Sequence, residues 1–182
     1  MPRELNLIIL NSRKGNQKAQ MKLYDLFCDS MFFTACRYLK DKEEAKEAMQ
    51  DGFLKAFLNL DKYLDDTSFG SWLKKIVINT SIDELKKKHL ETVSIEDYRL
   101  EALSEDDWSF DIEISKKEII EAIETLKMKY QLVVKLYLLE GYDHEEISEI
   151  LKINVKTSRT QLRRGKQILR ELLKRKKYDV GY

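Results

Sequence analysis

Proline and glycine are scarce in this sequence of 182 residues, which has one proline, Pro2, and six glycines. An average protein has about 5% proline, so the depletion is strong. A sandwich or barrel of many short strands needs frequent turns made with these residues, so the scarcity argues against both architectures. The composition, 36% charged and 43% apolar, instead favours an all-α protein. That apolar content can build a core, which argues against a chain that is disordered throughout.

Long apolar runs and paired cysteines are also missing. No segment approaches the length of a membrane-spanning helix, and the first ten residues lack the apolar stretch of a signal peptide. The two cysteines, Cys28 and Cys36, are eight residues apart on an expected helix. That spacing is about 12 Å of helical rise, too far for a disulfide. We therefore expect reduced thiols, no membrane insertion and a cytoplasmic protein.

Motifs of catalysis are absent as well. The sequence has no phosphate-binding loop, no HExxH or CxxC, and no nucleophile elbow. The two histidines, His89 and His144, fall at expected helix ends, and the adjacent acidic pairs fall at helix starts, where the helix dipole explains them. We expect no enzymatic activity, no catalytic residue, no metal and no cofactor.

The net charge of +1 hides strong blocks of opposite sign. Residues 1–90 carry +3, residues 91–113 carry −8, residues 114–151 carry −3 and residues 152–182 carry +9. The acidic block lacks helical periodicity, so we interpret it as a flexible linker between a domain at 1–90 and a domain at 114–177, with a tail at 178–182. Two interpretations of the linker stay open: an idle solvated tether, or a segment whose apolar residues lie against a partner.

Helical periodicity is clear in the first domain. It predicts a helix over residues 16–39, a second helix capped by Asp41, a loop over 61–68, and a third helix that Ser68 caps and that runs from Phe69 to about Lys88. The apolar face expected for the first of these is Met21, Tyr24, Phe27, Cys28, Met31, Ala35, Tyr38 and Leu39.

Trp72 falls at the edge of the apolar face of the third helix, beside Lys74 and Lys75. An exposed indole beside lysines can stack on an unpaired base while the lysines meet phosphate. Trp72 can equally be an ordinary core aromatic. The lysines that end this helix likewise have two explanations, DNA contact or complementation of the helix dipole.

The second domain has the pattern of a helix-turn-helix. Apolar residues at helical spacing span 114–139, up to a C-cap position at Gly141, and Asp143 with Glu146 forms a capping box for a short helix. After a three-residue turn, Asn154 caps a last helix that runs to about Lys177. Its expected buried stripe is Val155, Ser158, Leu162, Gly165, Leu169 and Leu172. Such helix pairs also occur in proteins that bind no DNA, but the +9 block on this helix favours a DNA-binding one.

Three segments together resemble the sigma-70 family of RNA polymerase sigma factors. Residues 44–57 resemble the core-binding helix of region two, residues 69–88 the promoter-melting and minus-ten helix, and residues 122–173 region four. The pattern Phe-x-x-Trp-Leu-x-x-Ile-x-x-Asn-x-x-x-Asp, from Phe69 to Asp83, is the most specific. With two such domains and no region three, the chain resembles the extracytoplasmic-function (ECF) branch.

The resemblance implies a transcription initiation factor with three functional surfaces. Residues on the helix that docks on the clamp helices of the largest polymerase subunit are Glu47, Gln50, Asp51 and Phe53. Those that capture a flipped minus-ten base and contact the opening strand are Asn59, Asp61, Tyr63, Ser68, Trp72, Lys74, Lys75 and Asn79. Those that meet the minus-thirty-five element are Lys156, Thr157, Arg159, Thr160, Arg163 and Arg164. The implied partners are core RNA polymerase, promoter DNA and an anti-sigma factor.

Some positions depart from the family pattern. Lys127 stands where the family usually has proline, Lys152 where it has glycine, Gln161 where it often has arginine, and Gly165 where it has alanine. Gly165 is expected to cost about 1 kcal/mol of helix stability relative to alanine. These departures leave the promoter sequence open. Two other functions also stay open: a stand-alone helix-turn-helix regulator that binds DNA without polymerase, and a helical adaptor that binds only protein.

Overall fold

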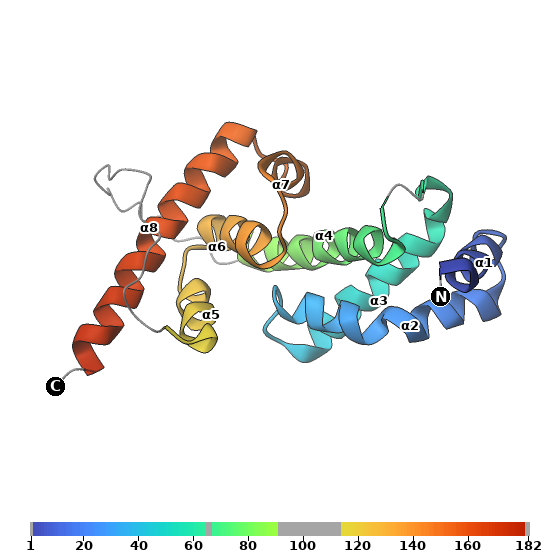
Figure 1. The fold of residues 1–182 in the computed structure, drawn as a ribbon, viewed down its shortest axis with the longest axis horizontal. Helices are drawn as coiled ribbons and strands as arrows, with labels where there is room; N and C mark the ends of the chain where they lie inside the picture. Colours follow the sequence, from blue (N-terminus) through green and yellow to red (C-terminus); the bar gives the residue numbers. More distant parts are fainter. Residues whose placement is uncertain (1, 65–66, 91–113, 181–182) are drawn as a thin grey trace. The chain divides into compact units, whose positions relative to one another are not determined.

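A computed structural model describes residues 2–64, 67–90 and 114–180 of the chain, and within them it contains helices and no strand. They belong to two compact units, Met1–Asp97 and Tyr98–Tyr182 (Figure 1). The all-α, two-domain prediction is therefore confirmed. The acidic linker expected at 91–113 and the last two residues of the tail lie outside the described residues. None of the described helices is long and apolar enough to span a membrane.

The first unit is a bundle of helices around one apolar core. Side chains cap the helices where the sequence predicts: Asp41 accepts from the N–H groups of Glu43 and Glu44, and Ser68 accepts from that of Ser71. The elements in chain order are α1 (Pro2–Arg13), α2 (Gln17–Cys36), α3 (Lys42–Leu58), the 3₁₀ turn η1 (Leu60–Lys62) and α4 (Phe69–Leu90).

The bundle differs from the sequence prediction in its first helix and in the face of α2. The sequence predicts no helix before residue 16, yet α1 packs against α2 and buries Ile9. Ala19 and Leu23 of α2 are buried, whereas Met21, between them on another side of the helix, is 60% exposed. The prediction that Met21 belongs to the buried face was wrong.

Helices α3 and α4 approach each other closely at Gly52. A Cβ atom at Gly52 would lie 2.7 Å from Cγ2 of Val77, so any larger residue would push the two helices apart. Two polar contacts also join these helices. Lys88 of α4 forms an ion pair with Glu44 of α3, and Lys55 Nζ of α3 donates to Thr80 Oγ1 of α4 at 3.1 Å. This close pairing places the exposed faces of α3 and α4 in a fixed relation.

The second unit breaks the helical pattern of residues 114–139 into separate elements. Thr125 ends the first helix, and Lys127, with the non-helical angles φ −55° and ψ 140°, precedes the next, so the prediction of one continuous segment was wrong. The Thr125 hydroxyl donates to the Ala122 carbonyl at 2.8 Å and closes the helix end. The elements are α5 (Lys116–Glu124), α6 (Met128–Val134), the π-helix η2 (Lys135–Leu139), α7 (His144–Leu151) and α8 (Val155–Val180).

The turns around α7 form as predicted. Asp143 and Glu146 make the capping box, the Asn154 carboxamide accepts from the N–H of Lys156 at 2.8 Å, and Gly141 has a φ of 79°. Lys152 ends α7 in the left-handed conformation, with φ 56° and ψ 45°. A residue with a Cβ is strained there, which explains why glycine suits this turn.

Replacing Lys152 with glycine is expected to stabilise the second unit. Glycine removes the strain of the left-handed conformation, about 1–2 kcal/mol. It also raises the conformational entropy of the unfolded chain, which offsets part of this gain, so a net stabilisation of about 0.5–1 kcal/mol is expected. Urea denaturation measures the change. Lys152→Ala is the matched control, because it removes the same charge and keeps the strain. An equal gain in both variants would contradict the conformational explanation.

The buried stripe of α8 follows the predicted spacing with two corrections. Ser158, Leu162, Gly165 and Leu169 are buried, but Val155 at the start of the stripe is only half-buried. At the other end Leu172 is half-buried, and the stripe continues at the buried Leu173. A Cβ atom at Gly165 would lie 2.7 Å from Cγ2 of the buried Val134. The expected advantage of alanine at Gly165 was therefore wrong, because packing against α6 leaves no room for a methyl group.

Candidate nucleic-acid interface

The outward face of α8 carries every residue that the sequence assigns to the minus-thirty-five element. All six side chains are exposed in the second unit: Lys156, Thr157, Arg159, Thr160, Arg163 and Arg164. Their exposure follows from the burial of the opposite stripe. The result is a helix face of cations and hydroxyls, the side chains that suit phosphate oxygens and base edges.

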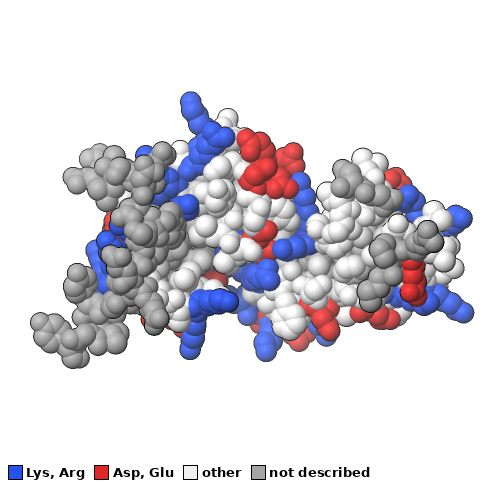
Figure 2. Space-filling model, in the orientation of Figure 1, with Lys and Arg blue, Asp and Glu red and all other residues white. Residues whose placement is uncertain are grey.

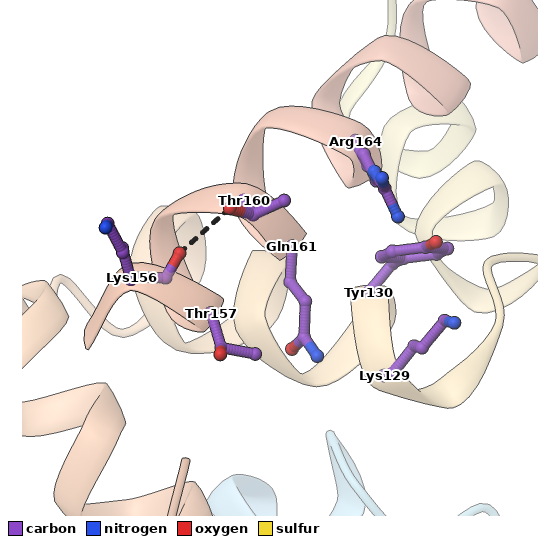
Figure 3. A pocket seen from close by; sticks show the side chains of 7 residues that line it. All are labelled: Lys129, Tyr130, Lys156, Thr157, Thr160, Gln161 and Arg164. Carbon is purple, nitrogen blue, oxygen red and sulfur yellow. Dashed lines mark hydrogen bonds between the residues drawn. The ribbon is translucent and has the colours of Figure 1, made fainter. Parts of the chain in front are cut away.

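A pocket of about 340 Å³ lies between this face and α6. Thr157, Gln161 and Arg164 border it from α8, and Lys129 and Tyr130 border it from α6 (Figure 3). Sequence reasoning missed Lys129 and Tyr130, because nothing in a helical pattern shows which neighbouring helix will flank the recognition face. Lys129 lies over the ring of Tyr130, with its Nζ 5.1 Å from the ring centroid. The arrangement adds a cation from a second helix to the basic face.

Helix α7 supports the start of α8 through His144. The ring nitrogen Nδ1 of His144 is 2.9 Å from the hydroxyl of the buried Ser158, and the ring stacks on Tyr137 with centroids 5.1 Å apart. These contacts join α7, η2 and α8 and fix the angle of the helix-turn-helix. His144 therefore has a structural role, with one partner residue in η2 and one in α8.

Acidic side chains of α7 lie next to the basic face of α8. Figure 2 shows a red patch over α7 beside blue side chains at the start of α8. Glu145 contributes one defined contact, an ion pair with Arg159 at 3.7 Å in which both side chains are well exposed. Exposed pairs of this kind contribute little to stability, so Arg159 can exchange this carboxylate for a phosphate at low cost.

Stability of the second unit is expected to fall as the pH drops below about 6.5. Burial, and next to it the Arg159 charge, lower the pKa of His144, outweighing the raising effect of Glu145 and Asp143. As the pH falls, His144 therefore takes up a proton in the unfolded chain before it does so in the folded chain. The stabilisation is complete above the unfolded pKa of His144 and is lost as the pH falls through its folded pKa. Urea denaturation at pH 7.5 and pH 5 measures the loss. His144→Gln should flatten this dependence; an unchanged slope would exclude His144 as its source.

A buried ion pair holds α5 against the element that follows α6. Lys135 is 3% exposed, and its Nζ lies 2.7 Å from Oε1 of Glu124. The second carboxylate oxygen of Glu124 accepts from Gln131 Nε2 at 3.1 Å, and the same nitrogen donates to the Ile123 carbonyl at 3.2 Å. This network holds the end of α5 against α6 and η2.

The expected polymerase-docking face of α3 is exposed with one exception. Glu47, Gln50 and Asp51 point to solvent, whereas Phe53 is 2% exposed and its ring packs 4.8 Å from that of Tyr24. Phe53 is thus a core residue that supports the helix and cannot itself contact a partner in this conformation. Leu54 and Leu58 are 60% and 82% exposed on the same helix, and sequence reasoning missed both.

The expected minus-ten residues of the segment between α3 and α4 differ in how exposed they are. Asp61 and Ser68 are exposed, while Asn59 is half-buried and donates from Nδ2 to the Lys55 carbonyl at 2.8 Å. Tyr63 is buried, and its hydroxyl donates to the Thr67 carbonyl at 2.8 Å. Tyr63 therefore shapes the loop and offers no surface to a base in this conformation. Residues 65 and 66 of the loop lie outside the described residues.

Trp72 lies at the edge of the core, between the two alternatives that the sequence left open. It is half-buried, with its ring centroid 5.4 Å from that of Tyr63 and 5.6 Å from that of Phe69. Lys74, Lys75 and Asn79 on the same helix are also half-buried. The indole thus packs on the core with part of its surface accessible. Aromatic packing below would hold it in place for contact from outside.

Groups that could hold a metal are missing from the part of the chain that the structure describes: no three His, Cys, Asp or Glu side chains come together there. Cys28 and Cys36 are free and half-buried.

Comparison with known families accounts for both units. Residues 23–90 match the family model for sigma-70 region 2, and residues 116–169 match that for sigma-70, region 4. The chain belongs to the sigma-70 family. It is 29% identical over 180 residues to the ECF RNA polymerase sigma factor SigW of Bacillus subtilis, covering 89% of this chain and 92% of that one. It is 25% identical over 174 residues to the ECF RNA polymerase sigma-E factor of Escherichia coli K12, covering 90% and 91%. This sigma factor therefore lies in the ECF branch, as its sequence motifs predict.

Solved structures show the same fold. CnrH, in complex with the cytosolic domain of CnrY, has a TM-score of 0.56 and 19% identity and covers 92% of this sigma factor and 96% of its own chain. RpoE of Bartonella quintana, in complex with the anti-sigma factor NepR, has a TM-score of 0.57 and 19% identity, with coverage of 85% and 96%. Both likenesses extend through the two helical units.

Proposed function

We propose that this chain binds core RNA polymerase in the cytoplasm and directs it to promoters, acting as a non-enzymatic initiation factor. The observation that carries the proposal is the exposed basic face of α8, set in a helix-turn-helix within a chain whose two regions both match the sigma-70 family. A helix of this kind presents arginine and threonine side chains to a major groove. The second unit would bind the minus-thirty-five element.

The first unit would dock on the polymerase and hold the minus-ten element. Helix α3 presents carboxylates and an amide at Glu47, Gln50 and Asp51, followed on the same helix by the apolar Leu54 and Leu58. A polar stripe that continues into exposed leucines suits a long protein helix such as those of the polymerase clamp. The leucines extend the docking surface that the sequence predicts.

The minus-ten strand would meet the α3–α4 loop and the accessible side of Trp72. Stacking of a base on an aromatic ring contributes about 1–3 kcal/mol, which offsets the cost of unstacking it from the duplex. Lys74 and Lys75 add positive charge along the same helix for the strand's phosphates. Strand opening then needs no ATP, because bound, unpaired bases replace the paired ones.

Trp72→Ala is expected to impair promoter opening more than closed-complex binding. Loss of the stacking surface should reduce the fraction of open complexes by about tenfold. Trp72→Phe is the control, since a smaller ring keeps packing against Tyr63 and Phe69. Permanganate footprinting measures opening, and a gel-shift assay in the cold measures the closed complex. Normal opening by the alanine variant would remove Trp72 from the melting surface.

We also propose an anti-sigma factor as a partner, because the similar sigma factor RpoE of Bartonella quintana is in complex with the anti-sigma factor NepR. The exposed leucines of α3 would be covered by polymerase in the holoenzyme, and an anti-sigma factor that covered them instead would compete with polymerase.

Run-off transcription with core polymerase, with and without this chain, tests the proposed function. Promoter-specific transcripts that depend on the chain are the expected result. A stand-alone regulator would instead bind its operator tightly without polymerase, and a protein-only adaptor would give no DNA crosslinks from α8. Either outcome, without chain-dependent transcripts, would contradict the proposal.

A further inference from the structure

Helix α1 lies beside the loop that connects α3 to α4 (Figure 1). The contact is made by Arg13, in the last turn of α1. Its Nε donates to the Leu60 carbonyl at 3.1 Å, and its Nη2 donates to the Tyr63 carbonyl at 2.8 Å. One guanidinium thus binds two main-chain oxygens at the two ends of the η1 turn. Arg13 lies before residues 23–90, the part of the chain that matches sigma-70 region 2.

The two bonded carbonyls belong to residues whose side chains enter the core. Leu60 is 2% exposed and Tyr63 is 6% exposed. The η1 turn and Tyr63 are therefore held from two sides: by the two buried side chains from within, and by Arg13 on the main chain. A planar guanidinium fits two acceptors where an ammonium group fits one.

The same bonds connect α1 to Trp72. The ring of Tyr63 packs against the indole of Trp72 with centroids 5.4 Å apart, so a shift of the Tyr63 main chain would also move the support of Trp72. Asn59, Asp61 and Lys62 lie between or next to the two carbonyls that Arg13 binds. Their side chains, including the Lys62 Nζ that donates to Asn59 Oδ1 at 2.7 Å, are oriented by the turn.

We infer that Arg13 is a positioning residue for the minus-ten strand: it holds the η1 turn and Tyr63, at the start of the α3–α4 loop, in the conformation that selects bases, without touching DNA itself. This inference rests on the proposed function. A simpler role, a cation that complements the dipole of α1, would apply equally to the exposed neighbour Lys14. The two bonds to a segment 47 and 50 residues away set Arg13 apart.

The experiment compares Arg13→Ala, Arg13→Lys and Lys14→Ala, each assembled with core polymerase. A random pool of single-stranded DNA selected on the wild-type holoenzyme supplies the probe oligonucleotide and its single-base variants. Fluorescence anisotropy measures affinity and base preference. Hydrogen exchange followed by mass spectrometry measures the opening of peptides from the loop, and a separate titration measures binding to core polymerase.

Arg13→Ala removes both bonds to the turn, so it should weaken binding of the selected oligonucleotide by about tenfold and should reduce its base preference. The loop peptides should exchange faster, while binding to core polymerase stays within about twofold. Arg13→Lys should be intermediate, because it keeps one bond, and Lys14→Ala should match the wild type.

Three results would overturn the inference. Unchanged affinity and base preference in Arg13→Ala would show that the loop needs no support from α1. Weaker binding with unchanged hydrogen exchange would show that Arg13 touches DNA directly. Loss of core binding together with DNA binding would show a general defect of the unit. If the wild-type holoenzyme itself selects no sequence, the proposed function fails, and that result is seen before any variant is examined.

Discussion

Glu124→Ala is expected to destabilise the second unit by about 3 kcal/mol. The substitution leaves the ammonium group of Lys135, which is 3% exposed, without the carboxylate 2.7 Å away. Breaking a buried pair from one side typically costs about 3–5 kcal/mol, and the partial exposure of Glu124 places this pair at the lower end. The Gln131 amide also loses an acceptor. Urea denaturation followed by circular dichroism measures the change, and hydrogen exchange of peptides from residues 116–169 assigns it to this unit.

The double variant Glu124→Ala with Lys135→Met separates charge from packing. With no buried charge left to strand, it should recover most of the lost stability, since an apolar side chain of similar length fills the Lys135 site. Glu121→Ala removes an exposed carboxylate of the same helix and should change stability by less than about 0.5 kcal/mol. A double variant no more stable than Glu124→Ala alone would show that the pair contributes by shape and not by charge.

Arg164→Ala is expected to weaken promoter binding by the holoenzyme by about tenfold or more and to lower its salt dependence. Each lost phosphate contact reduces the slope of log K against log salt by about 0.9, and the loss of one cation from the basic face gives an effect of this size. Lys129→Ala should lower the slope by a similar step, because Lys129 borders the same pocket from α6.

Lys117→Ala is the matched control for both variants. Lys117 is an exposed cation of the same unit on α5 and is not among the residues that line the pocket. Binding is measured by anisotropy on promoter DNA over a series of salt concentrations. If Lys129→Ala behaves as Lys117→Ala does, the pocket is not part of the DNA interface. If Arg164→Ala lowers affinity but keeps the slope, Arg164 contacts a base edge and not a phosphate.

The helix boundaries that the sequence predicts best are those set by neighbours in the chain. Asp41, Asp143 and Asn154 cap their helices through N–H groups two or three residues ahead. Such contacts form within one turn, so the residue types are sufficient to predict them. The outward face of α8 was predictable for a related reason, because a helix that buries one stripe must expose the other.

Residues whose surroundings come from distant segments were predicted less well. Tyr63 shares a loop with exposed candidate residues, and only packing against Phe69 shows that it is buried. Lys129 reaches the DNA-binding face from another helix. The contact surfaces of α3 and α6 therefore needed the structure.

The sequence by itself determined that this chain is a helical sigma factor with a basic recognition helix, because periodicity, caps and charge act over a few residues. Tertiary structure alone decided that Lys135 is buried with Glu124, that Gly165 has no room for a methyl group, and that Arg13 holds the loop beside Trp72. Each of these depends on atoms that are far apart in the chain and come together only when the helices pack.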